Sequence, residues 1–199
     1  TCLANPAMCC PTRATENSCE HESIAGGRSE PPGVFIGDLS AIIINNLPTW
    51  TELRRTPKKD IALLENWEEK LEKMAQSVLN ENICIIAGIP SWTLLLLKKV
   101  LEKSGKNSIV DVWPNLELYI HGGMSFKPYQ EAFHEILQIP EMNYVESYNS
   151  SEGYFGLQDQ IDSKELLLLT NSQVFYEFIP MTEFEGLDSK SVITLENVE

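Results

Sequence analysis

The chain has 199 residues, enough for one folded domain with a hydrophobic core, and a formal net charge of −14. Hydrophobic residues make up 43% and charged residues 22%, as in ordinary soluble globular proteins. Such an acidic chain repels nucleic acid, and it contains no apolar run of 18 or more residues that would span a membrane. We therefore expect no nucleic-acid partner and no membrane partner. Because the first residues lack the pattern of a secretory signal, we expect a cytoplasmic protein.

The first 33 residues differ in composition from the rest of the chain. They are rich in Pro, Gly, Ser, Thr and Cys, show no sustained hydrophobic period, and end in the linker-like GGRSEPPG. Four cysteines fall in the first 20 residues, without the paired spacing of a zinc site. We predict an irregular or disordered arm over residues 1–33 and a folded domain over residues 34–199.

Two segments after this arm are predicted to be helical. Residues 34–50 are apolar at helical spacing, and Pro48 closes the segment. Residues 56–82 give the clearest helix, with Thr56 as its N-cap and Pro57 at the first helical position. An apolar residue recurs every three or four positions along it, and we expect the Glu- and Lys-rich face between these positions to be wet.

Strand-like and helix-like segments then alternate. Short apolar runs are predicted as strands and longer periodic segments as helices, in the order strand 82–88, helix 89–105, strand 116–123, helix 125–138 and strand 142–149. The lysines of the first of these helices (Lys98, Lys99, Lys103 and Lys106) favour a solvated helix face over an anion-binding patch. Two successive strand–helix–strand units predict a parallel sheet.

The pattern changes towards the C-terminal end. Three short strand-like runs, at residues 154–159, 165–170 and 174–181, are separated by polar turns and predict an antiparallel ribbon. The predicted fold class is therefore α/β, with parallel strand–helix units followed by a short antiparallel β ribbon.

Two loops follow predicted neighbouring strands, HGGMS at residues 121–125 and YNSSEG at residues 148–153. Ligands of parallel α/β sheets bind beyond the carboxyl ends of the strands, so both loops could line one site. The glycines leave room for a flat ring, and the second loop supplies a tyrosine, hydroxyls and a carboxylate that suit a base, phosphates and Mg²⁺. A strand end whose Ser and Asn side chains cap a turn explains the same residues equally well.

Four blocks of sequence carry a family resemblance: ALLENWEEKLEKM, VWPNLELYIHGGMSFKPY, NYVESYNSSEGYFGLQDQ and FYEFIPM. In this order they resemble the auxin-responsive Gretchen Hagen family of acyl-acid amido synthetases, within the acyl-adenylate-forming superfamily. That superfamily has a Gly-Gly loop on one strand and an aromatic-x-x-Ser/Thr-Glu loop on the next. The resemblance extends over roughly residues 37–199 and implies part of an adenylate-forming large domain.

The resemblance implies roles for both loops. ATP or AMP would be bound by Gly122, Gly123, Tyr148, Asn149, Ser150, Ser151 and Glu152. Glu152 would also hold Mg²⁺, directly or through water. The acyl substrate pocket would include His121, Met124, Ser125 and Gly153, although a hydrogen-bonded strand-end role suits His121 equally well. The implied cofactors are ATP and Mg²⁺.

The implied reaction has two steps and two small-molecule substrates. A carboxylic acid attacks the α-phosphate of ATP, which gives an acyl-adenylate and pyrophosphate. An amine, such as an amino acid, then attacks the activated carbonyl and releases AMP. The implied enzyme is a ligase that forms a C–N bond.

The sequence shows the middle one of the family's three ATP motifs. The Ser/Thr-rich phosphate loop, the third ATP motif and the C-terminal lid domain are absent. We therefore expect a central fragment that is inactive alone and self-associates through an exposed truncation surface. One alternative is a truncated, non-catalytic module that binds a nucleotide or a protein, and another is an α/β domain with no surviving ligand.

Overall fold

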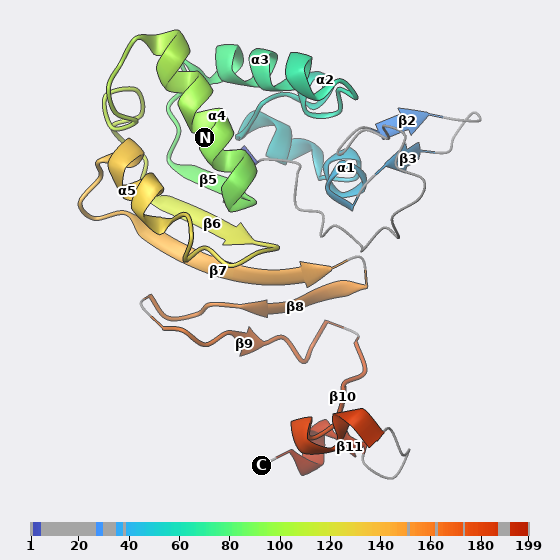
Figure 1. The fold of residues 1–199 in the computed structure, drawn as a ribbon. Helices are drawn as coiled ribbons and strands as arrows, with labels where there is room; N and C mark the ends of the chain where they lie inside the picture. Colours follow the sequence, from blue (N-terminus) through green and yellow to red (C-terminus); the bar gives the residue numbers. More distant parts are fainter. Residues whose placement is uncertain are drawn as a thin grey trace.

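The fold is built on one seven-stranded sheet, shown in Figure 1. The structure, a computed structural model, describes residues 2–4, 27–29, 35–37, 39–150, 152–161, 163–172, 174–186 and 192–198. In spatial order the strands are β4 (Arg55–Thr56), β1 (Cys2–Ala4), β5 (Ile85–Gly88), β6 (Leu118–Gly122), β7 (Asn143–Ser150), β8 (Gly153–Leu157) and β9 (Leu167–Leu168). Neighbouring strands are parallel from β4 to β7 and antiparallel from β7 to β9, which confirms the predicted fold class.

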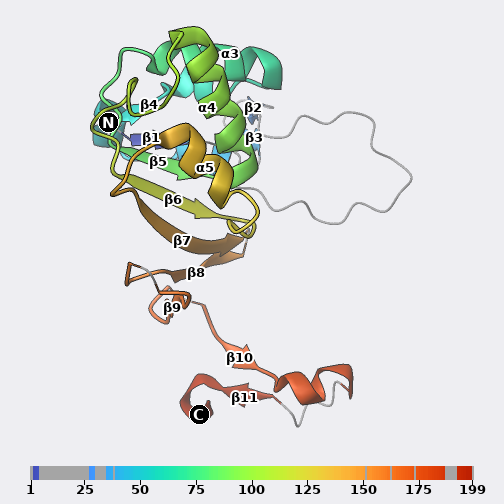
Figure 2. The ribbon, with the colours of Figure 1, turned by 60° about the vertical axis from the view of Figure 1, so that its left-hand side comes forward.

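Three helices lie on the same side of this sheet in both views (Figures 1 and 2): α3 (Trp67–Val78), α4 (Pro90–Ser104) and α5 (Gln130–Leu137). As predicted, α4 begins with Pro90 and ends at Gly105, whose φ of 67° is left-handed. No helix among the described residues is long and apolar enough to cross a bilayer.

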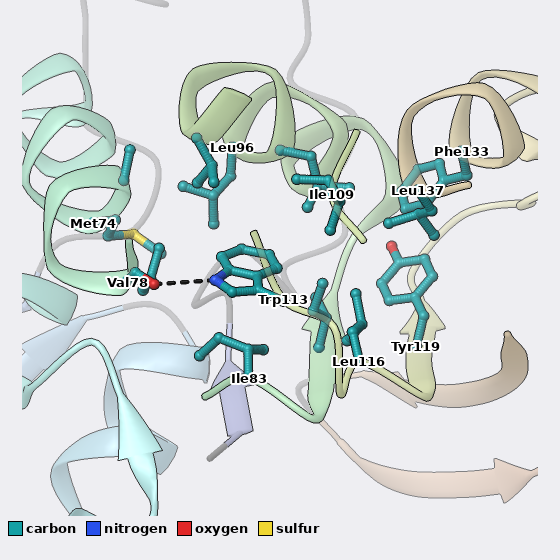
Figure 3. Close-up of a cluster of buried hydrophobic side chains, with 14 of the residues drawn as sticks. Met74, Val78, Ile83, Leu96, Ile109, Trp113, Leu116, Tyr119, Phe133 and Leu137 are labelled. Carbon is teal, nitrogen blue, oxygen red and sulfur yellow. Dashed lines mark hydrogen bonds between the residues drawn. The ribbon is translucent and has the colours of Figure 1, made fainter. Parts of the chain in front are cut away.

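A hydrophobic core lies between the three helices and strands β5 and β6 (Figure 3). Trp113 is fully buried there, and its indole N–H donates to the carbonyl of Val78 at 3.0 Å. Tyr119 of β6 stacks on Phe133 of α5 with 4.9 Å between the ring centres. The core therefore fixes the position of β6, the strand that carries the first candidate loop.

The single helix predicted over residues 56–82 is wrong, because two helices occupy that segment. The first, α2 (Lys59–Ala62), is short, and Thr56 lies in β4 rather than at a helix N-cap. The second, α3, is capped by Asn66, whose side-chain oxygen accepts from the Glu69 backbone N–H at 2.8 Å. An Asn three residues before a Glu is close to a capping-box pattern, and here it starts a new helix.

The prediction that the polar face of residues 56–82 is solvent-exposed fails at one residue. Lys70 is fully buried, because it lies one helical turn before the buried Met74 on the inward face of α3. Elsewhere that face is exposed, and Lys99 and Lys103 of α4 form ion pairs with Glu72 of α3. These pairs join the basic group of α4 to the acidic face of α3.

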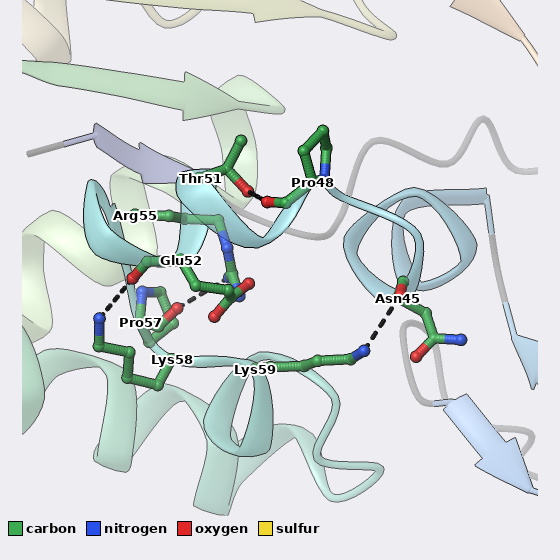
Figure 4. A network of polar contacts seen from close by, with 8 residues as sticks. All are labelled: Asn45, Pro48, Thr51, Glu52, Arg55, Pro57, Lys58 and Lys59. Carbon is green, nitrogen blue, oxygen red and sulfur yellow. Dashed lines mark hydrogen bonds and ion pairs between the residues drawn. The ribbon is translucent and has the colours of Figure 1, made fainter.

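The described part of the chain between β1 and β4 forms a separate two-stranded sheet and two short helices. It contains the antiparallel pair β2 (Gly27–Ser29) and β3 (Phe35–Gly37), then α1 (Leu39–Asn45) and η1 (Thr49–Leu53). In the polar network of Figure 4, Arg55 is buried, donates to the carbonyl of Pro57 at 2.8 Å and pairs with Glu52 at 2.7 Å. Lys59 donates to the carbonyl of Asn45 at 3.0 Å and so links α2 to α1.

Part of the predicted N-terminal arm is regular structure. Residues 2–4 form β1 inside the main sheet, and residues 27–29 form β2. The other residues of the 1–33 segment, with Cys9, Cys10 and Cys19, lie outside the described residues. The domain boundary at residue 33 stays a prediction.

The C-terminal ribbon divides into two parts. Strands β8 and β9 extend the main sheet, and β9 is its last strand. The third predicted run forms β10 (Glu177–Phe178), which pairs with β11 (Ile193–Thr194) in a separate two-stranded sheet. The helices η2 (Met181–Gly186) and η4 (Leu195–Asn197) flank β11, and both views place this unit beyond β9.

Candidate functional site

The two candidate loops follow neighbouring parallel strands, as the sequence predicts. Strand β6 ends at Gly122, which lies opposite Ser147 of β7. Strand β7 continues for three more residues, so Tyr148, Asn149 and Ser150 extend past the end of β6. Both loops therefore leave the same carboxyl edge of the sheet, where ligands of parallel α/β domains bind.

Gly122 is buried where β6 and β7 approach each other closely. A Cβ at this position would lie 2.3 Å from the carbonyl oxygen of Ser147, a distance that excludes any side chain. The Ser147 hydroxyl also donates to the carbonyl of His121 at 3.2 Å. Strand packing alone thus explains this glycine, and its role towards a base stays a prediction.

Gly123 needs glycine for a different reason. Its φ of 77° lies in the left-handed region that other residues rarely adopt. The residue is exposed, and Met124 and Ser125 after it are exposed as well. The Gly-Gly pair therefore turns the chain sharply away from the sheet towards α5.

The second loop is the turn of a β-hairpin. Ser150, the last residue of β7, lies opposite Gly153, the first residue of β8. The Ser150 hydroxyl donates to the Glu152 carboxylate and accepts from the Glu152 backbone N–H at 3.2 Å. Asn149 is half-buried and follows an irregularity in the pairing, and Ser151 lies outside the described residues.

The donor groups of this turn fit a Mg²⁺ ion shared with a nucleotide. Among the described residues, no group of three or more His, Cys, Asp or Glu side chains could hold a metal ion without a ligand. Nucleotide-bound Mg²⁺, however, usually needs only one or two protein carboxylates beside the phosphates and water. Glu152 is exposed at the carboxyl edge of the sheet and can supply one such carboxylate.

His121 lies in β6 and lines a cavity of about 580 Å³. The cavity also contacts Phe126 and residues of β7, among them Tyr144 and Glu146. The imidazole is buried and stacks on Phe126 with 4.5 Å between the ring centres, while its Nδ1 has no hydrogen-bond partner among the described residues. Of the predicted acyl-pocket residues, the cavity takes in His121 and Ser125 but not Met124 or Gly153.

Burial lowers the pKa of His121 to about 4. The imidazole is therefore neutral at pH 7, with one nitrogen able to donate and the other able to accept. Burial also raises the pKa of Tyr144 to about 12, so the tyrosine stays protonated. Both side chains offer neutral hydrogen-bonding groups to the cavity.

Two lysines give this cavity a local positive charge. Lys127 and Lys164 both line it, and neither has an ion-pair partner in the described part of the chain. Glu146 lines it as well, so the lining carries two positive charges and one negative charge. In a chain with a net charge of −14, this is a local region that can attract an anion.

Tyr148 faces a second, smaller cavity of about 330 Å³. Its ring is 55% exposed and lies 5.6 Å from the ring of Phe155, measured between centres. Neither Gly122 nor Gly123 lines this cavity, although Gly122 is only one strand away. The structure thus brings both loops to one edge, while the two cavities lie along different parts of β7.

Three residues of this region, Ser147, Leu168 and Tyr176, were not predicted from the sequence. Ser147 could have been found from the alternation of the β7 strand, which directs residues 145 and 147 to one face and residues 144 and 146 to the other. Leu168 gives no such signal, because only the pairing of β7, β8 and β9 brings it to the cavity beside Tyr148. Tyr176 reaches the same cavity from the segment between β9 and β10, and it gives no signal either.

The fold and the loops together define a class of protein. A parallel sheet with a glycine turn after one strand, and hydroxyl and carboxylate groups after the next, is an α/β domain with a ligand site at its carboxyl edge. The chain belongs to the GH3 family, because residues 14–141, more than half of its length, match the GH3 family N-terminal domain. This confirms the resemblance to the Gretchen Hagen family.

The match covers only part of the candidate site. His121, Gly122 and Gly123 lie within it, whereas β7 and the hairpin with Tyr148 and Glu152 follow it. No curated protein matches the chain. The roles of the hairpin residues therefore rest on their positions in the fold and on the sequence motif.

Proposed function

We propose that the chain contributes the ATP-binding and acid-binding centre of an acyl-acid amido synthetase. Such an enzyme activates a carboxylic acid as an acyl-adenylate and transfers the acyl group to an amine such as an amino acid. The observation that carries the proposal is membership of the GH3 family, a family of acyl-adenylate-forming ligases that use ATP and Mg²⁺. The placement of both loops at one sheet edge supports it.

We assign the nucleotide to the hairpin side of that edge. Tyr148 would pack against the base, and Ser150 and Ser151 would donate hydrogen bonds to phosphate oxygens. Glu152 would hold Mg²⁺, which when bound offsets the charge of the phosphates. Asn149, Gly122 and Gly123 would shape the backbone around the nucleotide.

We assign the carboxylic acid to the cavity beside His121. The unpaired ammonium groups of Lys127 and Lys164 would attract the carboxylate, and the rings of Phe126 and Tyr144 would pack on its apolar part. Met124 and Gly153 would border the path from this cavity to the nucleotide. The protein's part in the first step is to hold the carboxylate and the α-phosphate in line.

Acid-dependent release of pyrophosphate tests this function. Because we expect the chain to be inactive alone, the natural protein that contains it is incubated with ATP and Mg²⁺ and a panel of aryl, indolyl and aliphatic carboxylic acids, with and without amino acids. Pyrophosphate that appears only with an acid supports the proposal, and it should fall in Lys164→Ala but not in the surface control Lys98→Ala. Nucleotide binding without any acid-dependent turnover favours the alternative, a non-catalytic module that binds a nucleotide or a protein.

Two further parts of the proposal concern surroundings and assembly. We propose a cytoplasmic location and self-association through the apolar side chains exposed at the ribbon, including Leu167, Phe175 and Met181. Sedimentation velocity over a range of protein concentrations tests the association. A sedimentation coefficient that stays constant over that range contradicts it.

A further inference from the structure

A further cavity, of about 520 Å³, adjoins the cavity beside His121. Its described lining comes from α5, from the loop after it and from the start of β7. Three residues, Gln130, Met142 and Tyr144, line both cavities, so the two are parts of one continuous groove. We call the cavity beside His121 the His121 cavity and the further one the distal cavity.

The groove runs along β7. Met142, Tyr144 and Glu146 alternate with residues of the opposite face, so their side chains line one side of the strand. The His121 cavity reaches Glu146, whereas the distal cavity extends to Gln138 and Pro140, which precede β7. From Met142 to Glu146 an extended chain covers about 13 Å, at roughly 3.3 Å per residue. The distal cavity therefore prolongs the groove away from the carboxyl edge, to which we assign the nucleotide.

A row of stacked rings connects the two cavities. His134 of α5 stacks on Tyr144 of β7 with 5.7 Å between the ring centres, and Tyr144 stacks on Phe126 at 5.0 Å. Phe126 stacks in turn on His121 at 4.5 Å. The planes of neighbouring rings differ by only 27–30°, so the four rings form one wall along the groove. An extended ligand can pack against this wall over its whole length.

The two cavities differ in charge. Lys127, Lys164 and Glu146 line the His121 cavity, whereas the described lining of the distal cavity contains no Asp, Glu, Lys or Arg. The distal cavity offers instead the side-chain amides of Gln130 and Gln138, which can both donate and accept hydrogen bonds. The Gln138 amide donates to a backbone carbonyl of α5 at 3.2 Å, which leaves its oxygen for a ligand. The groove thus fits a ligand with a charged head and an uncharged polar tail.

We propose that the distal cavity binds the far end of the acid substrate, and that this substrate is a long-chain carboxylic acid with an uncharged polar group, such as a hydroxyl, on its tail. The proposal rests on the proposed function, which places the carboxylate beside Lys127 and Lys164. A tail of roughly ten carbons, joined in a zigzag by bonds of about 1.5 Å, spans the 13 Å or so of groove along β7. Because each methylene that leaves water strengthens binding, long acids should be better substrates than short ones.

Chain-length profiles test the distal cavity. The natural protein that contains the chain is given ATP, Mg²⁺, amino acids and linear carboxylic acids of 4 to 16 carbons, with and without a terminal hydroxyl, and kcat/KM is measured from pyrophosphate release. His134→Trp fills the distal cavity, whereas Glu135→Trp places the same bulk at an exposed position that lines neither cavity. Gln138→Leu removes the amide at the far end. Circular dichroism melts show which variants are folded, and Gln138→Trp takes the place of His134→Trp if that variant is unfolded.

The expected result is a length preference that depends on the distal cavity. Hydroxy acids of about ten to twelve carbons should exceed butanoic acid at least about tenfold in kcat/KM. His134→Trp should lower kcat/KM about tenfold for these long acids and leave butanoic acid within about twofold, while Glu135→Trp changes neither. Gln138→Leu should abolish a preference of about fivefold for the hydroxy acid over the unsubstituted acid of the same length.

Two other results are distinguishable. If acids cause pyrophosphate release, but neither chain length nor His134→Trp affects kcat/KM, the distal cavity is not part of the acid site and the proposed function stands. If no acid causes pyrophosphate release, with aryl and indolyl acids included, the proposed function fails and this inference fails with it.

Discussion

The helix-covered part of the sheet and the C-terminal ribbon differ in how they treat apolar side chains. Under α3, α4 and α5, large side chains such as Trp113 and Phe133 are fully buried. In the ribbon, Phe175 is 77% exposed and Met181 is 85% exposed. Strand β7 joins the two parts, since Ser147 is buried and Tyr148 after it is exposed. The buried side chains of the helix-covered part stabilise the fold. The ribbon leaves apolar side chains exposed, where a ligand can contact them.

Two tryptophans allow the largest test of this contrast. Trp113→Ala removes a fully buried ring and its 3.0 Å hydrogen bond to Val78, and should reduce the free energy of unfolding by roughly 3–5 kcal/mol. Trp50→Ala, at a position 67% exposed, should change it by less than about 0.5 kcal/mol. Urea denaturation followed by circular dichroism measures both values. Similar losses in the two variants would contradict the contrast.

Two glycines give the next test. Gly122→Ala forces a Cβ to within 2.3 Å of the Ser147 carbonyl oxygen, so β6 and β7 must separate, at a cost of about 1–3 kcal/mol. In Gly156→Ala of the ribbon, the new Cβ would lie 3.3 Å from the Leu166 Cβ, and the edge strand β9 can give way. We expect the second loss to be the smaller, by the same denaturation measurement. A larger loss at Gly156 would show that the ribbon is packed as rigidly as the helical part.

The buried His121 predicts a pH dependence on the helix-covered side. Its pKa is about 4 in the folded chain and 6.5 when unperturbed, so the unfolded chain binds more protons between these values. The stabilising contribution is present above pH 6.5 and is lost as the pH falls towards 4. Between pH 7.5 and pH 5.0 the loss amounts to about 2 kcal/mol.

Replacing the histidine isolates this contribution from the titrating carboxylates. His121→Gln should lose about 2 kcal/mol less stability than the unmodified chain between pH 7.5 and pH 5.0. His134→Gln, at an exposed position of α5, is the matched control and should follow the unmodified chain. Identical pH profiles for His121→Gln and the unmodified chain would mean that folding does not lower the pKa of His121.

The smallest effect is expected at the cap of α3. Asn66→Ala removes the side-chain acceptor of the Glu69 N–H and should cost about 1 kcal/mol of unfolding free energy. Thermal melts compare it with Asn80→Ala, an exposed asparagine just after the same helix. Equal melting temperatures for the two variants would speak against Asn66 as the start of α3.

The same contrast explains what the sequence could predict. In the helix-covered part, α4 has a strong hydrophobic period with Pro90 at its start and Gly105 just after its last residue, so both ends of that helix follow from nearby residues. The break between α2 and α3 was missed, because the apolar period continues through it and only the Asn66 cap marks it. The burial of Lys70 was missed because its charge outweighs its position one turn before Met74.

Prediction of the site follows the same division. The hairpin from Tyr148 to Gly153 could be placed from its motif and the preceding strand, and the structure puts it at the edge where parallel sheets bind ligands. The residues that share a cavity with Tyr148 could not be found, because Leu168 reaches it through the β8–β9 pairing and Tyr176 from the segment between β9 and β10. Likewise, the β-branched residues 192–194 are typical of a strand, but nothing in the sequence shows that residues 193–194 pair with β10.

Calorimetric titration with ATP and Mg²⁺ tests the central claim most directly. Three proteins are compared: the unmodified chain, Glu152→Ala in the hairpin turn, and Lys103→Ala on the distant α4. We predict Mg²⁺-dependent ATP binding that is lost or greatly weakened in Glu152→Ala and unchanged in Lys103→Ala. Binding that is equal in all three proteins, or absent from the unmodified chain, would contradict a nucleotide site at the β7–β8 turn.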